Sequence, residues 1–169
     1  MRTMLVGLPV LMVAAALESS VLPDLRTPGG GGLNLVLLLT LSWTLSGDWN
    51  GGLVWGLLGG LFLDLLSGGP LGIHSLALVA TAYVASLTEG QLWRSHILLP
   101  LAAALFGSLV FQLLALTGLA VSGVAIDVAI ALTGVVLPST LLNTLFILPV
   151  YAIMRRVHAL VYPAPVKSA

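Results

Sequence analysis

The stretch Gly52-Leu-Val-Trp-Gly56-Leu-Leu-Gly-Gly60-Leu-Phe-Leu-Asp64 decides the fold class of this chain. Its four numbered residues are spaced by four, and on an α-helix such positions follow one face, drifting by about 40° per step. Three glycines on one face make a flat strip against which a second helix can pack closely. Asp64 continues the strip within an apolar run, where insertion scales assign a charge a cost of about 2.5–3.5 kcal/mol. We therefore expect a helix-packing surface that ends in a carboxylate with a specific partner or function.

The composition of the whole chain predicts an integral membrane protein. Of 169 residues, 59% are hydrophobic and only 7% are charged, and the mean hydropathy is +1.13. A soluble domain carries about 25% charged residues, so lipid must solvate most of this chain. The net charge is zero and no basic run is present, which argues against nucleic acid as a partner. The chain has no cysteine, which excludes disulfides and thiolate chemistry.

Apolar stretches separated by turn-forming or polar segments predict an all-α fold, in one polytopic membrane domain with about six transmembrane helices. The expected spans are roughly residues 3–22, 33–46, 52–66, 71–88, 97–119 and 135–154. The first resembles a signal peptide, but the rest of the chain is equally apolar, so we expect a retained span. Spans two and three are short, since 14 or 15 helical residues reach about 21–23 Å against a hydrocarbon core of about 30 Å. They either extend through their turn residues or form a hairpin that stops partway.

The connection at residues 120–134 is apolar apart from Ser122, Asp127 and Thr133. Its apolar positions are compatible with an amphipathic helix lying on the outer surface. The alternative is a loop packed on the bundle.

The basic residues predict the orientation, because cytoplasmic loops carry an excess of Lys and Arg. With the N-terminus inside, the cytoplasmic set is Arg2, Arg94, Arg155, Arg156 and Lys167, and the outer set is Arg26 alone. We therefore expect both termini in the cytoplasm. Asp64 and Asp127 then lie toward the outer side.

No catalytic or metal-binding constellation is apparent. His74, His96 and His158 lie in different elements without ligand spacing, and no GxSxG, HExxH or Walker motif occurs. Ser108 is expected to be a small packing residue rather than a nucleophile. Glu18 lies in the last turn of the first span, where its side chain can reach the outer interface. We expect no enzyme activity, no cofactor and no metal.

Two polar positions need an explanation inside the membrane. For Asp64 three hypotheses stand: a buried role in packing or partner contact, an interfacial carboxylate that caps the start of span four, or ligand and proton chemistry. In span six, Pro138 frees a backbone carbonyl one turn earlier, which Ser or Thr side chains can satisfy. Asn143 requires hydrogen bonds, and Gln112 in span five is the expected neighbour.

The pattern resembles the family of the rod shape-determining protein MreD. That family carries a GxxxGxxxDxxxxxxxG signature after a short second span, and the matching residues here are Gly56, Gly60, Asp64 and Gly72. The family often opens span two with Pro-Asp or Pro-Asn. Here Asn34 is present but Leu33 precedes it, so this element is half matched. Pro138 and Asn143 resemble a polar spot in the family's last span.

The resemblance implies a non-enzymatic scaffold or regulator of the cell-elongation machinery in the bacterial inner membrane, supporting lateral peptidoglycan synthesis and rod shape. It implies the bitopic protein MreC as partner, within a complex that includes an actin-like filament protein, a polymerase and a penicillin-binding transpeptidase. It also implies a fold like the substrate-binding component of energy-coupling-factor vitamin transporters. The partner surface would use either the strip of Gly52, Gly56 and Gly60 or the 120–134 segment.

The alternative function is the substrate-binding component of a vitamin-like uptake transporter. It requires polar or aromatic side chains that converge on an outer cavity. The candidates are Asn34, Asp64, His74 and Asp127.

Overall fold

The computed structural model describes residues 2–87 and 97–162 of the chain. Its helices are α1 (Arg2–Ser20), α2 (Leu35–Leu45), α3 (Trp49–Ser67), α4 (Ile73–Ser86), α5 (Leu98–Val121), α6 (Val128–Ala131) and α7 (Leu137–Val161). A short 3₁₀ turn, Leu22–Leu25, follows α1, and a π-helical turn, Leu132–Val136, joins α6 to α7. No strand occurs within the described ranges, and the prediction of an all-α fold is confirmed.

Four of the helices are long and apolar enough to cross a membrane: Thr3–Ser20, Trp49–Ser67, Leu98–Val121 and Val128–Val161. Three spans differ in length from their expected ranges. The third is 19 residues long and extends through its turn residues, which is one of the two alternatives expected for it, whereas the fourth, α4, has only 14. The second, α2, is shorter still than expected, with 11 residues.

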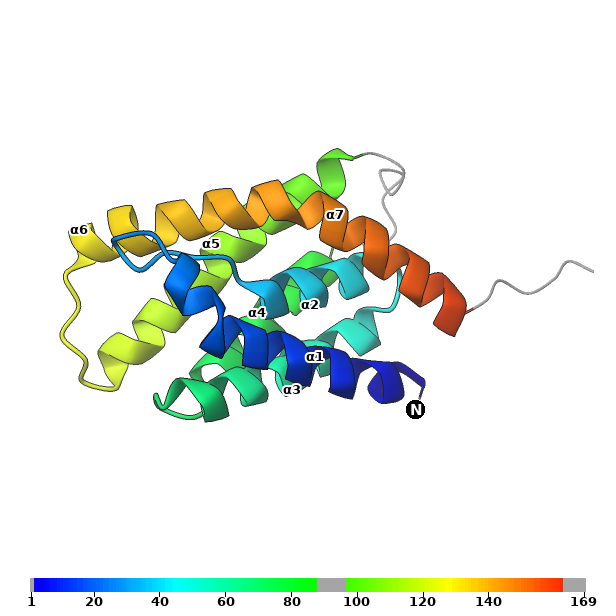
Figure 1. Cartoon of the computed structure of the whole chain (residues 1–169), viewed down its shortest axis with the longest axis horizontal. Coiled ribbons are helices and arrows are strands. Elements are labelled where there is room, and N and C mark those ends of the chain that lie inside the picture. Colours follow the sequence, from blue (N-terminus) through cyan, green and yellow to red (C-terminus); the bar gives the residue numbers. More distant parts are fainter. Residues whose placement is uncertain (1, 88–96, 163–169) are drawn as a thin grey trace, which may run out of the picture.

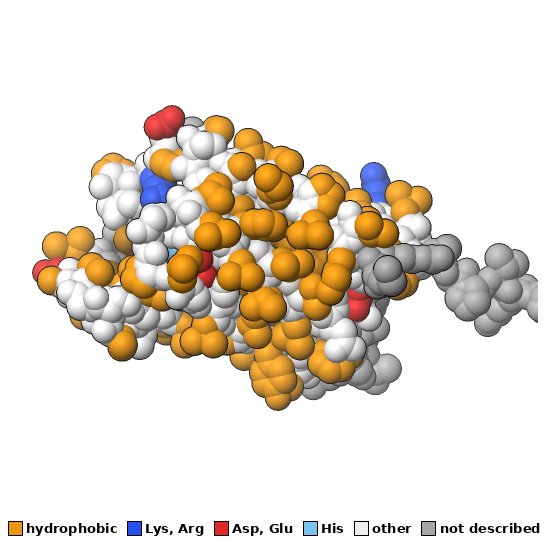
Figure 2. All heavy atoms as spheres, turned by 90° about the horizontal axis from the view of Figure 1, so that it is seen from below, with side chains coloured by type: hydrophobic (Ala, Val, Ile, Leu, Met, Phe, Trp, Pro, Cys, Tyr) orange, Lys and Arg blue, Asp and Glu red, His pale blue; other side chains and the backbone are white. Residues whose placement is uncertain are grey.

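The start of α1 and the end of α7 lie at the same end of the bundle. In Figure 1, α1 begins and α7 ends at the right, while the α3–α4 turn and α6 lie at the left. The Thr3 hydroxyl hydrogen-bonds both the Tyr162 hydroxyl and the carboxylate of Asp48, the N-cap of α3. Acidic and basic side chains lie toward the two ends, and the middle of the face in Figure 2 is mostly hydrophobic. This distribution matches a bundle whose long axis crosses a bilayer.

Helix α2 forms the centre of the bundle. Every residue from Val36 to Leu45 is buried, and α2 packs against α1, α3, α4, α5 and α7. Lipid can cover an apolar helix as well as protein can, so an apolar surface alone does not require this central position. With 11 residues α2 reaches about 16 Å, which is too short for a hydrocarbon core of about 30 Å, and the surrounding helices enclose it.

The glycine strip of α3 packs within the chain. A Cβ added at Gly60 would lie 2.2 Å from the Ser75 Cα, and one at Gly56 would lie 3.1 Å from the Leu78 backbone, so both glycines face α4. A Cβ at Gly52 would lie 2.0 Å from Thr44 Oγ1 on α2. Because α2 and α4 of the same chain pack against these glycines, the strip is not available in this fold as a surface for a partner protein.

The structure at residues 120–134 differs from both sequence-based alternatives. Helix α5 continues to Val121, and residues from Val128 onward begin the last long helix. Pro138 has no N–H to donate, so the carbonyl of Gly134, four residues earlier, is free of the helical ladder. It accepts hydrogen bonds from Gly31 N (3.0 Å) and Thr27 Oγ1 (3.3 Å), which belong to the loop after α1. A π-helical turn at this point widens the helix and accommodates the contact.

Glycine substitutions test the close contact between α3 and α4. Replacing Gly60 by Ala should lower the free energy of unfolding by about 1–3 kcal/mol, because the new methyl group overlaps the α4 backbone. Gly56→Ala should cost less, since its Cβ would lie 3.1 Å from the nearest atom, and Gly60→Leu should cost more. The measurement is thermal unfolding of the detergent-solubilised protein.

Gly69→Ala is the matched control, because its Cβ would meet only the Ser67 hydroxyl at 3.5 Å. Equal stability of the Gly60→Ala and Gly69→Ala variants would contradict the close contact.

Candidate functional site

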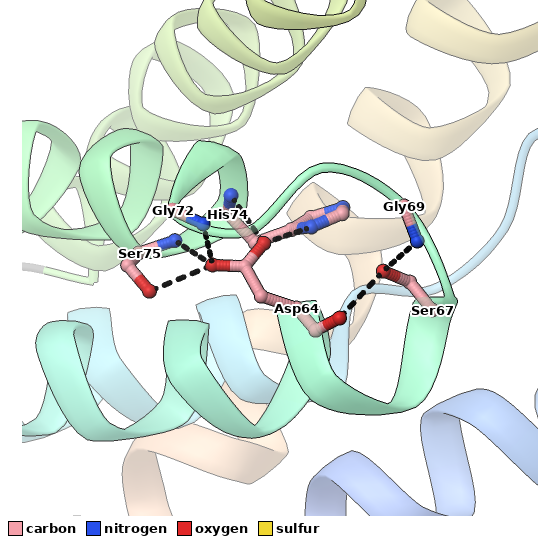
Figure 3. A network of polar contacts seen from close by, with 6 residues as sticks. All are labelled: Asp64, Ser67, Gly69, Gly72, His74 and Ser75. Carbon is pink, nitrogen blue, oxygen red and sulfur yellow. Dashed lines mark hydrogen bonds and ion pairs between the residues drawn. The ribbon is translucent and has the colours of Figure 1, made fainter.

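Asp64 caps the start of α4. Its Oδ1 accepts hydrogen bonds from His74 N (2.9 Å) and contacts His74 Nδ1 at 2.8 Å. Its Oδ2 accepts from Gly72 N (2.9 Å), Ser75 N (3.2 Å) and the Ser75 hydroxyl (2.8 Å). Figure 3 shows these groups converging on the carboxylate from the turn and from the first residues of α4. The side chain of Asp64 is fully buried.

Sequence and geometry agree on why this cap is needed. The first N–H groups of a helix have no partner within the helix, and the N-cap of α4 is Gly72, which has no side chain to supply one. Gly72 has φ +96°, a left-handed conformation that glycine adopts readily. Asp64 therefore replaces the missing N-cap side chain from a neighbouring helix, and its negative charge is stabilised by the α4 dipole.

The five donors around Asp64 use the hydrogen-bonding capacity of the carboxylate, which offers about four lone-pair sites. An ion at this position would have to displace them. Of the three hypotheses for Asp64, the geometry therefore favours capping, at a buried rather than an interfacial position. No group of three His, Cys, Asp or Glu side chains capable of holding a metal is present in residues 2–87 and 97–162.

Helix α2 is capped in the same way. Glu18, on α1, accepts hydrogen bonds from Val36 N (2.9 Å) and from the Asn34 side-chain amide (3.4 Å). Asn34 is the N-cap position of α2 but makes no side-chain cap of its own. Glu18 is 7% exposed, so the expectation that it reaches the outer interface is wrong. It turns inward because the α2 start offers N–H donors.

Three amide side chains join α2, α5 and α7. Asn34 Oδ1 accepts from Gln112 Nε2 (3.0 Å) and Asn143 Nδ2 (2.9 Å), while Asn143 Oδ1 accepts from Asn34 N (2.8 Å). Asn143 Nδ2 also lies 2.6 Å from the Ser108 hydroxyl, and the Ser139 hydroxyl accepts from Gly32 N (3.0 Å). Through these bonds, Ser139 and Asn143 accept from backbone N–H groups of the segment before α2, which is not helical.

A cavity of about 510 Å³ is lined by Glu18, which caps α2, and by His74, which contacts the α4 cap Asp64. Its polar lining includes Glu18, Arg26, Asn34, His74 and Gln112, and its apolar lining includes Leu63, Leu66, Phe111, Leu116 and Leu119. The volume falls within the range of about 300–1,000 Å³ typical of ligand pockets. The cavity's lining residues come from the end of α1, the α3–α4 turn and the start of α7, which lie opposite to the start of α1 and the end of α7 in Figure 1, and from α5.

The candidate residues predicted from the sequence lie in different parts of the structure. Gly52, Gly56 and Gly60 lie in helix contacts, and Asp64 and Gly72 build the α4 cap. Asn34, Gln112 and Asn143 form one hydrogen-bonded cluster. Pro138 lies four residues after Gly134, whose carbonyl accepts a hydrogen bond from Gly31 N. Asp127 lies apart, where its carboxylate caps α6 through Ala129 N and Ile130 N. His96 lies outside the described residues, as do the basic residues Arg94 and Lys167.

The hydrogen bonds of Glu18, Ser75 and Ser139 were not predicted from the sequence, and Ser108 was predicted only as a packing residue. Glu18 could have been predicted as a hydrogen-bond acceptor, because it shortly precedes a segment with few other polar side chains. Ser75 and Ser139 carry no such signal, because isolated serines in apolar helices are common.

These observations define a multi-pass helical membrane protein with internally capped short helices and a polar cavity at one end. A family model described as rod shape-determining protein MreD matches residues 3–157 of the 169-residue chain. The chain belongs to this family, and it is a rod shape-determining membrane protein. No curated protein and no solved structure matches it. The expected likeness to the vitamin-transporter component therefore stays a prediction.

Substitutions of Asp64 test the capping role. We expect stability and cell-shape complementation in the order wild type, Asp64→Asn, Asp64→Leu. Asparagine keeps one acceptor oxygen but directs an amide group at donors, whereas leucine leaves every donor unpaired, at about 1–3 kcal/mol for each buried group. The measurements are thermal unfolding and rod-shape rescue at matched membrane protein levels.

A role that requires the negative charge of Asp64 predicts that the Asn and Leu variants are equally defective. If both variants had normal stability and normal membrane protein levels and lost cell-shape complementation equally, the carboxylate would have a function in addition to capping α4.

Proposed function

We propose that this protein is a non-enzymatic scaffold of the cell-elongation machinery, and that it supports lateral peptidoglycan synthesis through the bitopic membrane protein MreC. The observation that carries the proposal is the match to the MreD family over residues 3–157. The wider complex would include an actin-like filament protein, a polymerase and a penicillin-binding transpeptidase.

The use of the polar residues supports a scaffold rather than an enzyme. Asp64 and Glu18 cap helices, and Asn34, Gln112 and Asn143 bond one another. A catalytic pair would need a nucleophile within reach of a base. Here these five side chains hydrogen-bond helix starts or one another, which fixes the positions of the helices.

The partner surface would lie on the outside of the bundle. The glycine strip is occupied by α2 and α4, which leaves the lipid-facing helix surfaces for a single-span partner. On α1 and α7, large apolar side chains such as Leu5, Met12, Leu141 and Leu145 are more than half exposed. In a bilayer these side chains can be covered by acyl chains or by a partner helix, so contact with a partner would depend on how closely the two helix surfaces fit.

We further propose an inner-membrane location with both termini in the cytoplasm. The start of α1 and the end of α7 share one end of the bundle (Figure 1), and Arg155 and Arg156 belong to that end through α7. Arg26 belongs to the opposite end, in the loop after α1. The positive-inside rule then assigns the end with the termini to the cytoplasm.

A transport role remains the second candidate, and the cavity is the observation that favours it. Of its four candidate residues, Asn34 and His74 line the cavity. Asp64 and Asp127 do not, since each caps a helix.

Labelling of single cysteines tests the topology, and the chain contains no native cysteine to interfere. Ser122→Cys, in the exposed turn after α5, should react with an impermeant thiol reagent added to intact spheroplasts. Ser168→Cys, near the C-terminus, should react only after the membrane is opened. Reaction of both from outside would contradict the proposed orientation.

Co-purification from native membranes tests the function. We expect the tagged full-length protein to retain MreC, and its gene to restore rod shape in cells that lack their own copy. Asp64→Leu is the loss-of-fold comparison and should retain less MreC. Recovery of an ATPase module and a bound small molecule, without MreC, would contradict the scaffold and support transport.

A further inference from the structure

Gln112 contributes to the cavity lining a hydrogen-bonding atom that neither helix cap uses. The hydrogen bond of Gln112 within the described part of the chain is made by its Nε2, which leaves Oε1 as an acceptor. Gln112 is 7% exposed and lines the cavity. This oxygen is therefore open to an occupant of the cavity that carries an N–H or O–H group.

The other inner groups are acceptors as well. His74 contacts Asp64 through Nδ1, so a neutral ring with its proton on that atom presents Nε2 to the cavity as an acceptor. Glu18 adds carboxyl oxygens to the lining. An occupant that fits these three residues carries several hydrogen-bond donors at its inner end.

The mouth of the cavity has the opposite character. Arg26 lines it, is exposed, and has no salt bridge with a carboxylate of residues 2–87 or 97–162. A guanidinium group binds phosphate with paired N–H donors. The cavity is thus ordered, with acceptors inside and a cation outside.

Part of the remaining lining consists of leucines that are partly or largely exposed. Leu66, at the end of α3, is 46% exposed, and Leu116 and Leu119 on α5 are partly exposed. Since both helices are long enough to span a membrane, an occupant with hydrocarbon chains can extend along these leucines into the bilayer.

We propose that this cavity binds the headgroup of an amine-bearing phospholipid, with the primary ammonium at Gln112, Glu18 and His74, the phosphate at Arg26, and the acyl chains along Leu66, Leu116 and Leu119. A primary ammonium supplies three donors. A quaternary ammonium supplies none and is usually held by several aromatic rings. Here Phe111 is the one Phe, Tyr or Trp ring among the described lining residues, which favours a primary amine.

Native mass spectrometry of the full-length protein tests this site. The delipidated protein is titrated in detergent with dioleoyl phosphatidylethanolamine or dioleoyl phosphatidylcholine, which have the same net charge and chains and differ in amine donors. We expect retention of the ethanolamine lipid to exceed that of the choline lipid by at least about fivefold, where tenfold corresponds to about 1.4 kcal/mol. Equal retention of the two lipids would overturn headgroup recognition.

Two variants locate the site. Arg26→Gln should lower retention of the ethanolamine lipid by about fivefold through loss of the phosphate contact, while Arg156→Gln, the same change at an exposed site on α7, should not. Ala115→Phe fills the cavity and should abolish the preference, while Ala102→Phe on the exposed face of α5 should preserve it. Arg26 is exposed, so its variant is informative even if Ala115→Phe fails to fold. Unchanged selectivity and affinity in Arg26→Gln would overturn the assignment.

A last comparison distinguishes a lipid from a soluble ligand with the same headgroup. Glycerophosphoethanolamine, which lacks acyl chains, should bind at least about tenfold more weakly than the lipid, because it buries no hydrocarbon against the leucines. Equal binding of the two compounds would overturn the lipid assignment.

Discussion

Helix α2 begins inside the bundle and α4 begins at a half-buried turn, and the first N–H groups of a helix have no partner within the helix. Each start is supplied with a carboxylate from the preceding long helix: Glu18 of α1 reaches Val36, and Asp64 of α3 reaches His74 and Ser75. A helix start attracts an anion through both its free N–H groups and its dipole. The buried acids therefore supply the hydrogen-bond acceptors that the starts of α2 and α4 lack. The N–H groups of these starts in turn stabilise the buried carboxylates.

This pairing fixes the relative positions of the helices. The cap requires α4 to begin near Asp64, and Gly60 and Gly56, one and two turns earlier, let the α4 backbone approach along the same face. The glycine spacing and the aspartate thus act as one unit in a helical hairpin. At α2, the amides of Asn34, Gln112 and Asn143 extend the same logic by connecting its start to α5 and α7.

Much of this arrangement was predictable from local pattern. Spacing by four predicted the glycine face, Pro138 predicted a free carbonyl, and the Gly-Gly-Pro turn put His74 and the backbone before it within reach of Asp64. The donors to the Gly134 carbonyl were not predictable, because Gly31 and Thr27 lie more than 100 residues away from Gly134 in the sequence. Glu18 was misinterpreted for a similar reason: an acid at a helix end is ordinarily at the interface, and only the tertiary position of α2 draws it inward. The 120–134 segment was misassigned because its apolar periodicity is the same whether a helix lies on a surface or continues into a span.

The glycine loop after α1 shows why the polar groups accumulate at one end of this molecule. Residues 27–31 form a turn beside Gly134, closed by hydrogen bonds from Thr27 N to Gly31 O (2.7 Å) and from Gly30 N to Thr27 O (2.8 Å), and an added Cβ at Gly29 would lie 2.4 Å from the Gly134 Cα. Backbone N–H groups that bond neither within this turn nor within a helix need another acceptor in an apolar setting. Gly134, Ser139 and Asn143 provide these acceptors. A bundle that admits such a loop must place side-chain oxygens and amides around it. The loop and the α4 cap do not fill the space between them, and the cavity is what remains, lined by the polar groups that each of them requires.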